Sequence, residues 1–262
     1  MRACAVADAI VVKDDSIFPT PMSTAAIRNV LLLLLACVAG SVDAVSYVGL
    51  GHVFTANMTG NTVLLGLALG QAEHRAVVRS GLALVGFLAG VALGTWTANR
   101  GRPSSAWPPA MTATLAVEWG LLAAWAVGWY FAGDLEANYT ARAVLIVPSA
   151  LAMGIQSAVG HRFPLSGVVT TYITGTLTNL IARLVERCGA PASQASPTQE
   201  ARAAAQMKPS VGLLAAMWAI YIGGAAGAAM VISLLGPLAA LVVPIAVLTA
   251  VTLIAVISFR RP

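Results

Sequence analysis

Residues 27–50 read IRNVLLLLLACVAGSVDAVSYVGL, a predominantly apolar run with one acid, Asp43, well inside it. A helix needs about 20 such residues to cross about 30 Å of hydrocarbon. The whole chain has a matching composition, since 58% of its 262 residues are hydrophobic and 10% are charged, against about 25% charged in a soluble domain. Because a single chain in lipid satisfies its backbone within helices, we predict an all-α, polytopic transmembrane helix bundle.

Seven further segments have the composition of membrane helices, at 53–69, 77–97, 111–131, 141–159, 165–184, 211–235 and 237–259. Two other stretches do not. Residues 1–24 mix acids, a lysine and prolines without any period, which is typical of a mobile cytoplasmic tail. Residues 188–208 have no apolar stripe and are predicted to form a polar linker.

The two halves of the chain resemble each other, which predicts a first membrane repeat over 25–133 and a second over 139–259, interrupted by the linker. At a constant offset of 114, Ala36, Gly40, Asp43, Ala44, Val45 and Tyr47 match Ala150, Gly154, Ser157, Ala158, Val159 and His161. At an offset of 115, MTGN at 58–61 corresponds to ITGT at 173–176. Transporters often arise by internal duplication and hold their substrate between the repeats.

Glycines recur at helical spacing in both halves. The third segment carries Gly86, Gly90 and Gly94, and the seventh carries Gly223 and Gly227 in a comparable position. Small residues allow helices to approach closely in lipid. These glycines therefore predict tight helix pairs, and they permit a homo-oligomer.

The basic residues indicate that both termini lie in the cytoplasm. With eight crossings, 12 of the 15 basic residues are cytoplasmic, as the positive-inside rule requires. Six crossings, with 53–69 and 165–184 re-entrant and the halves inverted, also leave 12 inside. That alternative exchanges Arg75, Arg79 and Arg142 for Arg100, Arg102 and Arg162. We favour eight because segments of 17 and 20 residues are closer to full spans than to short dips.

Polar side chains within these segments are the candidates for function. An acid at the centre of a membrane helix costs about 2.5 to 3.5 kcal/mol and is a functional candidate for that reason. We predict that Asp43 binds a proton or cation and that Glu118 assists as a proton relay; alternatively, Asp43 only locks two helices together. The candidate substrate-binding residues are Asp43, Tyr47, Thr55, Asn57, Thr59, Gly60, Asn61, Gln156, Thr170, Thr171, Thr174, Gly175 and Thr176.

Several other classes of site find no support in the sequence. No spacing among His, Cys, Asp and Glu resembles a metal site, a catalytic triad or a phosphate loop, so we expect no metal, no cofactor and no catalytic residue. The basic residues are scattered between apolar segments and form no patch for nucleic acid. The expected partners are the lipid bilayer and an unknown small solute or ion.

Four motifs in this order resemble those of the YoaK family of bacterial membrane proteins, domain of unknown function 1275. They are AGSVDAVSY at 39–47, FTANMTGNTVLLG at 54–66, MGIQSAVGHR at 153–162 and TTYITGTLTNL at 170–180. The resemblance covers about residues 28–258. It implies a polytopic inner-membrane protein and brings no established substrate.

The polar positions shared by the two halves favour a small-solute or ion transporter or permease. A non-transporting membrane scaffold or regulator is the main alternative, because its polar residues would only hold helices together. A membrane enzyme is a weaker third.

Overall fold

The computed structural model describes residues 23–99, 109–135, 137–162, 173–189 and 209–259, and within these ranges the chain is helical between short connections, with no strand. The helices are α1 (Thr24–Gly49), α2 (Met58–Gly70), α3 (His74–Ala98), α4 (Pro109–Ala132), α5 (Tyr139–Arg162), α6 (Ile173–Gly189), α8 (Val211–Leu235), α9 (Pro237–Ala240) and α10 (Val242–Phe259). The all-α prediction is confirmed.

Six helical stretches in the described part of the chain are long and apolar enough to cross a bilayer, namely α1, α3, α4, α5, α8 and the run Pro237–Phe259 formed by α9 and α10. The shortest has 23 residues, which corresponds to about 35 Å of helix. Large apolar side chains face outward, with Phe131 80% exposed and Ile257 72% exposed, whereas Asp43 and Glu118 are buried. A bundle with apolar groups outside and polar groups inside suits lipid as its solvent.

The second apolar segment is shorter than predicted, because α2 begins only at Met58 and has 13 residues. That length gives about 20 Å of helix, less than the hydrocarbon thickness. Gly51, with φ of +85°, and His52, with φ of +61°, reverse the chain after α1. The residues that follow are held by Asp43 in a loop. The predicted bounds of this segment are therefore wrong, and its helix is shorter than a full span, on which the preference for eight crossings rested.

The first residues of the predicted segment 165–184 lie outside the described residues. Its described part belongs to α6, which has 17 residues and is not among the six long apolar stretches. The six-crossing alternative fits these lengths better.

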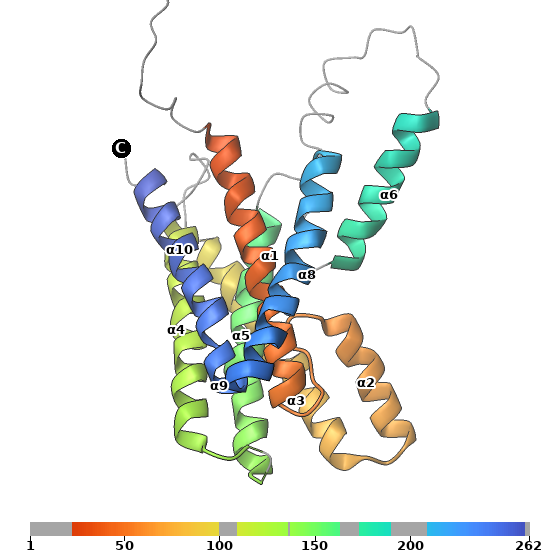
Figure 1. Ribbon diagram of the computed structural model, residues 1–262, viewed down its shortest axis with the longest axis vertical. Helices are drawn as coiled ribbons and strands as arrows, with labels where there is room; N and C mark the ends of the chain where they lie inside the picture. Colours follow the sequence, from red (N-terminus) through yellow and green to blue (C-terminus); the bar gives the residue numbers. More distant parts are fainter. Residues whose placement is uncertain (1–22, 100–108, 136, 163–172, 190–208, 260–262) are drawn as a thin grey trace, which may run out of the picture.

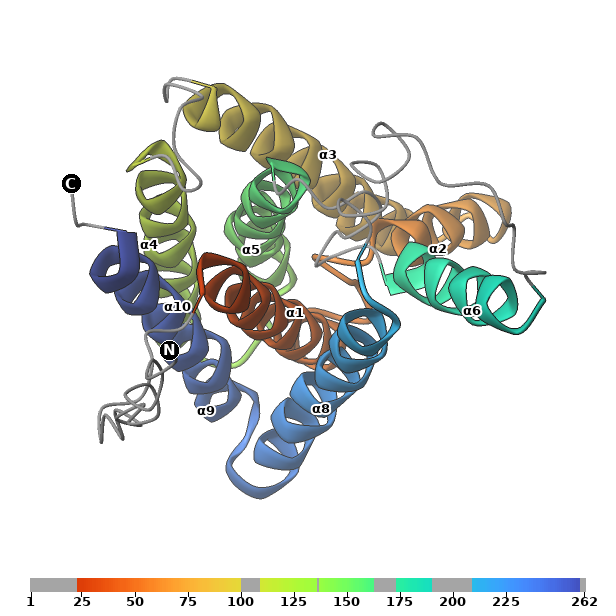
Figure 2. The ribbon, with the colours of Figure 1, turned by 90° about the horizontal axis from the view of Figure 1, so that it is seen from above.

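Two central helices, α1 and α5, organise the bundle. Helix α1 packs against α8 and α10, while α5 packs against α3 and α4. The short helix α2 packs on α3, and α6 packs on α8. Figure 1 shows α2 and α6 beginning near the middle of the bundle and running toward opposite ends. Seen from above in Figure 2, both lie on the same side of the molecule.

Glycines allow the two closest helix pairs. A Cβ on Gly90 of α3 would lie 2.2 Å from the carbonyl oxygen of Leu151, and a Cβ on Gly154 of α5 would lie 2.2 Å from that of Phe87. These distances leave no space for a side chain. Gly86 and Gly94 also face α5, so the predicted tight packing of this helix is confirmed.

The pair formed by α1 and α8 is equally tight. A Cβ on Gly40 would lie 2.1 Å from the carbonyl oxygen of Tyr221, and one on Gly224 would lie 2.5 Å from that of Cys37. The predicted contact residues of the seventh segment are wrong, because Gly223 and Gly227 face open space. The contact residue is Gly224, one position along the helix from Gly223.

We expect Gly154→Val to prevent stable folding. The added side chain collides with backbone atoms of α3, which cannot rotate away, and overpacking of this kind costs about 1–3 kcal/mol or more. The matched control is Gly227→Val, where a Cβ meets nothing within 4 Å. Thermal unfolding of the detergent-purified variants measures the difference. Equal melting temperatures for the two variants would contradict the close approach of α3 and α5.

Candidate functional site

Asp43, on the last turns of α1, holds the chain that leads into α2. Its Oδ1 accepts backbone N–H groups from Thr55 at 3.0 Å, Ala56 at 2.7 Å and Asn57 at 3.2 Å. Its Oδ2 accepts the hydroxyl of Tyr221 on α8 at 2.6 Å. The side chain is only 3% exposed. An ionised carboxylate only accepts hydrogen bonds, and four donors aimed at it are the arrangement that stabilises a buried negative charge.

Two asparagines complete this loop. The Asn57 side chain caps α2 by accepting the N–H of Gly60 at 3.2 Å. Asn61 accepts the backbone N–H of Phe54 at 3.0 Å and donates its own amide to the Phe54 carbonyl. The side-chain amides of both asparagines thus bond to backbone groups of their own loop. Together with Asp43 they determine where α2 begins.

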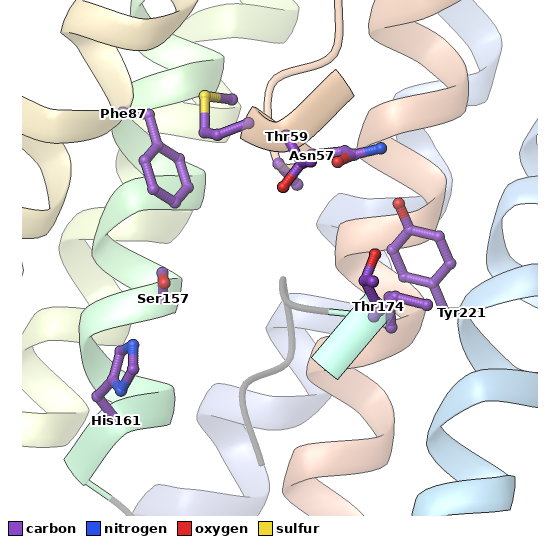
Figure 3. A pocket seen from close by; sticks show the side chains of 10 residues that line it. Asn57, Thr59, Phe87, Ser157, His161, Thr174 and Tyr221 are labelled. Carbon is purple, nitrogen blue, oxygen red and sulfur yellow. The ribbon is translucent and has the colours of Figure 1, made fainter. Parts of the chain in front are cut away.

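A cavity of about 440 Å³ lies beside this loop, a size typical of small-molecule sites. Its walls come from the starts of α2 and α6 and from α3, α5 and α8, through Ala56, Asn57, Met58, Thr59, Phe87, Ser157, His161, Ile173, Thr174 and Tyr221. We call it the central cavity. Figure 3 shows Phe87, Ser157 and His161 along one wall, with Thr174 and Tyr221 opposite.

The chemistry of the central cavity is polar without a formal charge. Hydroxyl, amide, imidazole and phenol groups line it beside apolar side chains, and no Asp, Glu, Lys or Arg is among the described residues that do so. The beginnings of α2 and α6 face it from two sides (Figure 3). A helix N-terminus carries about half a positive charge, so the start of α2 favours a negatively polarised group in the cavity.

Of the candidate residues, Asn57, Thr59 and Thr174 line the central cavity. Asp43 lies behind the wall and contacts it through Tyr221 and Asn57. The binding role proposed for these residues stays a prediction.

The structure places the remaining candidates elsewhere. Tyr47 is 37% exposed and stacks on Phe54 at 4.9 Å between ring centroids. Gln156 donates its amide to the carbonyl of Leu35 at 2.9 Å and ties α5 to α1. Five more described candidates lie outside the cavity lining, namely Thr55, Gly60, Asn61, Gly175 and Thr176. Thr170 and Thr171 lie outside the described residues.

Sequence reasoning missed Phe87, Ser157, His161 and Tyr221 as lining residues. Ser157 and His161 had a signal, because they match Asp43 and Tyr47 in the repeat. Phe87 and Tyr221 had none, since an aromatic residue in an apolar helix does not by itself indicate a cavity.

Glu118, the second candidate acid, lies on α4 away from the central cavity. Its side chain is fully buried, and neither carboxyl oxygen has a hydrogen-bond partner among the described residues. The indole N–H of Trp125 is also without a partner there. Proton transfer by Glu118 stays a prediction. Within the described ranges, no group of three His, Cys, Asp or Glu side chains has the arrangement of a metal site.

We expect Asp43→Ala to be among the most destabilising single substitutions in this chain. It leaves three buried N–H groups without an acceptor, at about 1–3 kcal/mol for each. Asp43→Asn keeps the shape and one acceptor oxygen, and Tyr221→Phe removes one donor, so both should unfold at temperatures between those of Asp43→Ala and the wild type. Thermal unfolding in detergent measures the order, and wild-type stability of Asp43→Ala would refute the anchoring role.

Comparison with known proteins supports a family assignment. A family model described as "Protein of unknown function (DUF1275)" matches residues 31–254. The UPF0700 transmembrane protein YoaK of Bacillus subtilis is 40% identical over 160 residues, which cover 61% of this chain and 68% of that protein. No solved structure matches. With several apolar helices and these matches along most of its length, the chain is a membrane protein that belongs to the DUF1275 family.

Proposed function

We propose that the protein is a transporter or permease for a small polar solute, which binds in the central cavity. The observation that carries this proposal is the meeting of two short helices, α2 and α6, whose first residues line one cavity near the middle of the bundle. Interrupted helices that begin at mid-depth are how many transporters present backbone groups and helix dipoles to a substrate. The proposal assigns no catalytic step to the protein.

We also propose that the two halves form an inverted repeat, as many transporters do. Each half contributes a central helix, a short helix and a long helix, as α1, α2 and α3 or as α5, α6 and α8. The packing is reciprocal, because α1 packs on α8 of the other half and α5 packs on α3. If each half crosses the membrane three times, the second half enters from the opposite side, as inverted repeats do.

Individual positions support the same relation. Gly90 and Gly224 make the close contacts of α3 and α8, and they are 134 residues apart. Phe87 and Tyr221, three residues earlier on each helix, have the same separation and both line the central cavity. Thr59 and Thr174 form another matched pair in the lining. The cavity thus lies where the two halves meet.

We further propose six crossings of a bacterial cytoplasmic membrane, with both termini inside. The start of α1 and the end of α10 lie at one end of the bundle (Figure 1). Arg75, Arg79 and Arg142 belong to the first turns of α3 and α5, at the opposite end. This orientation places 12 of the 15 basic residues on the cytoplasmic side.

A scaffold remains the alternative, and one observation favours it. The side chains of Asp43, Asn61 and Gln156 all bond to the protein itself, as residues that only hold helices together would. The two functions differ in whether the central cavity opens to water on both sides of the membrane.

The six-crossing topology predicts that Gln71→Cys is modified from outside the cell. Gln71 is exposed at the end of α2, and it would be cytoplasmic if α2 crossed the membrane. The measurement is labelling by a membrane-impermeant maleimide in a background where Cys4, Cys37 and Cys188 are replaced. Glu186→Cys, exposed on α6, should react only in inside-out vesicles. Reaction of Gln71→Cys only in those vesicles would establish the eight-crossing topology instead.

Transport predicts that Ser157→Cys, in the same background, is modified from both sides of the membrane. Ser157 lines the central cavity, and alternating access exposes such a site to each side in turn. The matched control is Ser149→Cys on the same helix, which is fully buried and should react from neither side. Modification of Ser157→Cys from one side only, or from neither, would favour the scaffold.

The same variant identifies the solute. Amino acids, sugars, carboxylates and alkali cations are added one at a time, and a bound solute should slow the modification of Ser157→Cys. Uptake of the protecting solute into liposomes that contain the wild-type protein then tests transport directly, with Ser157→Trp as the variant whose cavity is filled.

A further inference from the structure

A second cavity, of about 670 Å³, lies at the end of the bundle where α3 and α5 begin. Its lining includes His52, Arg79, Trp129, Asp134 and Arg142. It is separate from the central cavity, with which it shares no lining residue. We call it the arginine cavity.

The two arginines are close neighbours. A Cβ placed on Gly51 would lie 3.2 Å from Nη1 of Arg142 and 3.2 Å from Nε of Arg79. Gly51 has a φ of +85°, a conformation that suits glycine, and its missing side chain leaves room for both guanidinium groups. The turn after α1 therefore brings two positive charges together.

Neither of these two guanidinium groups forms an ion pair in the described part of the chain. Arg142 is held by the carbonyl of Leu135, to which it donates from Nε at 2.9 Å and also from Nη2. Its Nη1 makes no further hydrogen bond there, and Arg79 makes neither a hydrogen bond nor an ion pair. Both side chains are partly buried. Adjacent like charges that are partly removed from water are unfavourable until an anion joins them.

We propose that the arginine cavity binds an oxyanion, a carboxylate or phosphate group, between Arg79 and Arg142. Guanidinium groups match the planar oxygens of these anions and bind them with two hydrogen bonds at once. Trp129 adds an apolar wall, because its ring lies directly against Gly49. Among the described lining residues the acid is Asp134, an exposed residue that accepts the N–H of Ala137 at 3.3 Å.

The oxyanion has two possible sources, a soluble anion or the phosphate of a lipid headgroup. The test uses full-length protein in nanodiscs at constant ionic strength. In one arm, inorganic phosphate or acetate is titrated into phosphatidylcholine nanodiscs, with chloride as the reference. In the other, phosphatidylglycerol replaces part of the phosphatidylcholine. Binding is measured by calorimetry for the soluble anions and by native mass spectrometry for the lipid.

The deciding variant is Arg79→Gln, which removes one guanidinium without breaking a hydrogen bond of the described structure. We expect it to weaken oxyanion binding at least about tenfold, the size of one charge-assisted contact, and Arg79→Lys to retain part of the affinity. The matched control is Arg75→Gln, one turn earlier on α3. Arg75 lies over the ring of Tyr139 at 5.3 Å from its centroid, outside the arginine cavity, so its substitution should leave binding unchanged.

Retention of phosphate or acetate by the wild type in phosphatidylcholine identifies a soluble anion, and retention of phosphatidylglycerol alone identifies a lipid headgroup. Either result supports the proposed site if the Arg79→Gln variant no longer retains the bound anion or lipid. The proposal is overturned if the wild type binds none of these probes, or if Arg79→Gln and Arg75→Gln bind equally. This binding test is independent of the Ser157→Cys labelling that tests transport, because the arginine cavity and the central cavity share no lining residue.

Discussion

The carboxylate of Asp43 is the constraint on which the centre of this bundle depends. A charge inside an apolar helix persists only where donors replace water, and here three backbone N–H groups and the Tyr221 hydroxyl do so. Because the backbone N–H groups of residues 55–57 bond to this carboxylate, they do not form the hydrogen bonds of a helix that would extend α2 toward the N-terminus. Helix α2 consequently starts at Met58, inside the bundle, and its first residues are left facing the central cavity.

The matched position in the second half carries a different residue with a different consequence. Ser157 is the residue that the proposed repeat aligns with Asp43, and its single hydroxyl cannot accept three N–H groups as the carboxylate does. Ser157 lines the central cavity, whereas Asp43 lies behind the wall. The central cavity thus has one wall anchored by the Asp43 carboxyl group and another to which Ser157 contributes a hydroxyl.

Hydropathy predicted the helical class and the long apolar segments, but not the number of crossings. Segment 53–69 carries no charged residue, and the positive-inside count is equal for six or eight crossings. The contact that sets the start of α2 joins Asp43 to residues 12–14 positions later. No periodicity in the sequence encodes this contact. The motif around Asn57 and Thr59 did predict part of the cavity. Tyr221 and Phe87 could not be predicted, because only helix packing brings them to it.

A buried polar side chain in a membrane helix does not show by its residue type whether it binds a ligand or only holds parts of the protein together. Asp43, Asn61 and Gln156 have the residue types expected of substrate ligands, yet each is engaged by backbone groups of the protein. Loss of Asp43 lowers stability under either function, so its substitution does not distinguish a transporter from a scaffold. Ser157, Thr59 and Thr174 do distinguish them, since they line open space rather than a packed interface. Functional evidence should therefore come from side chains at the cavity surface.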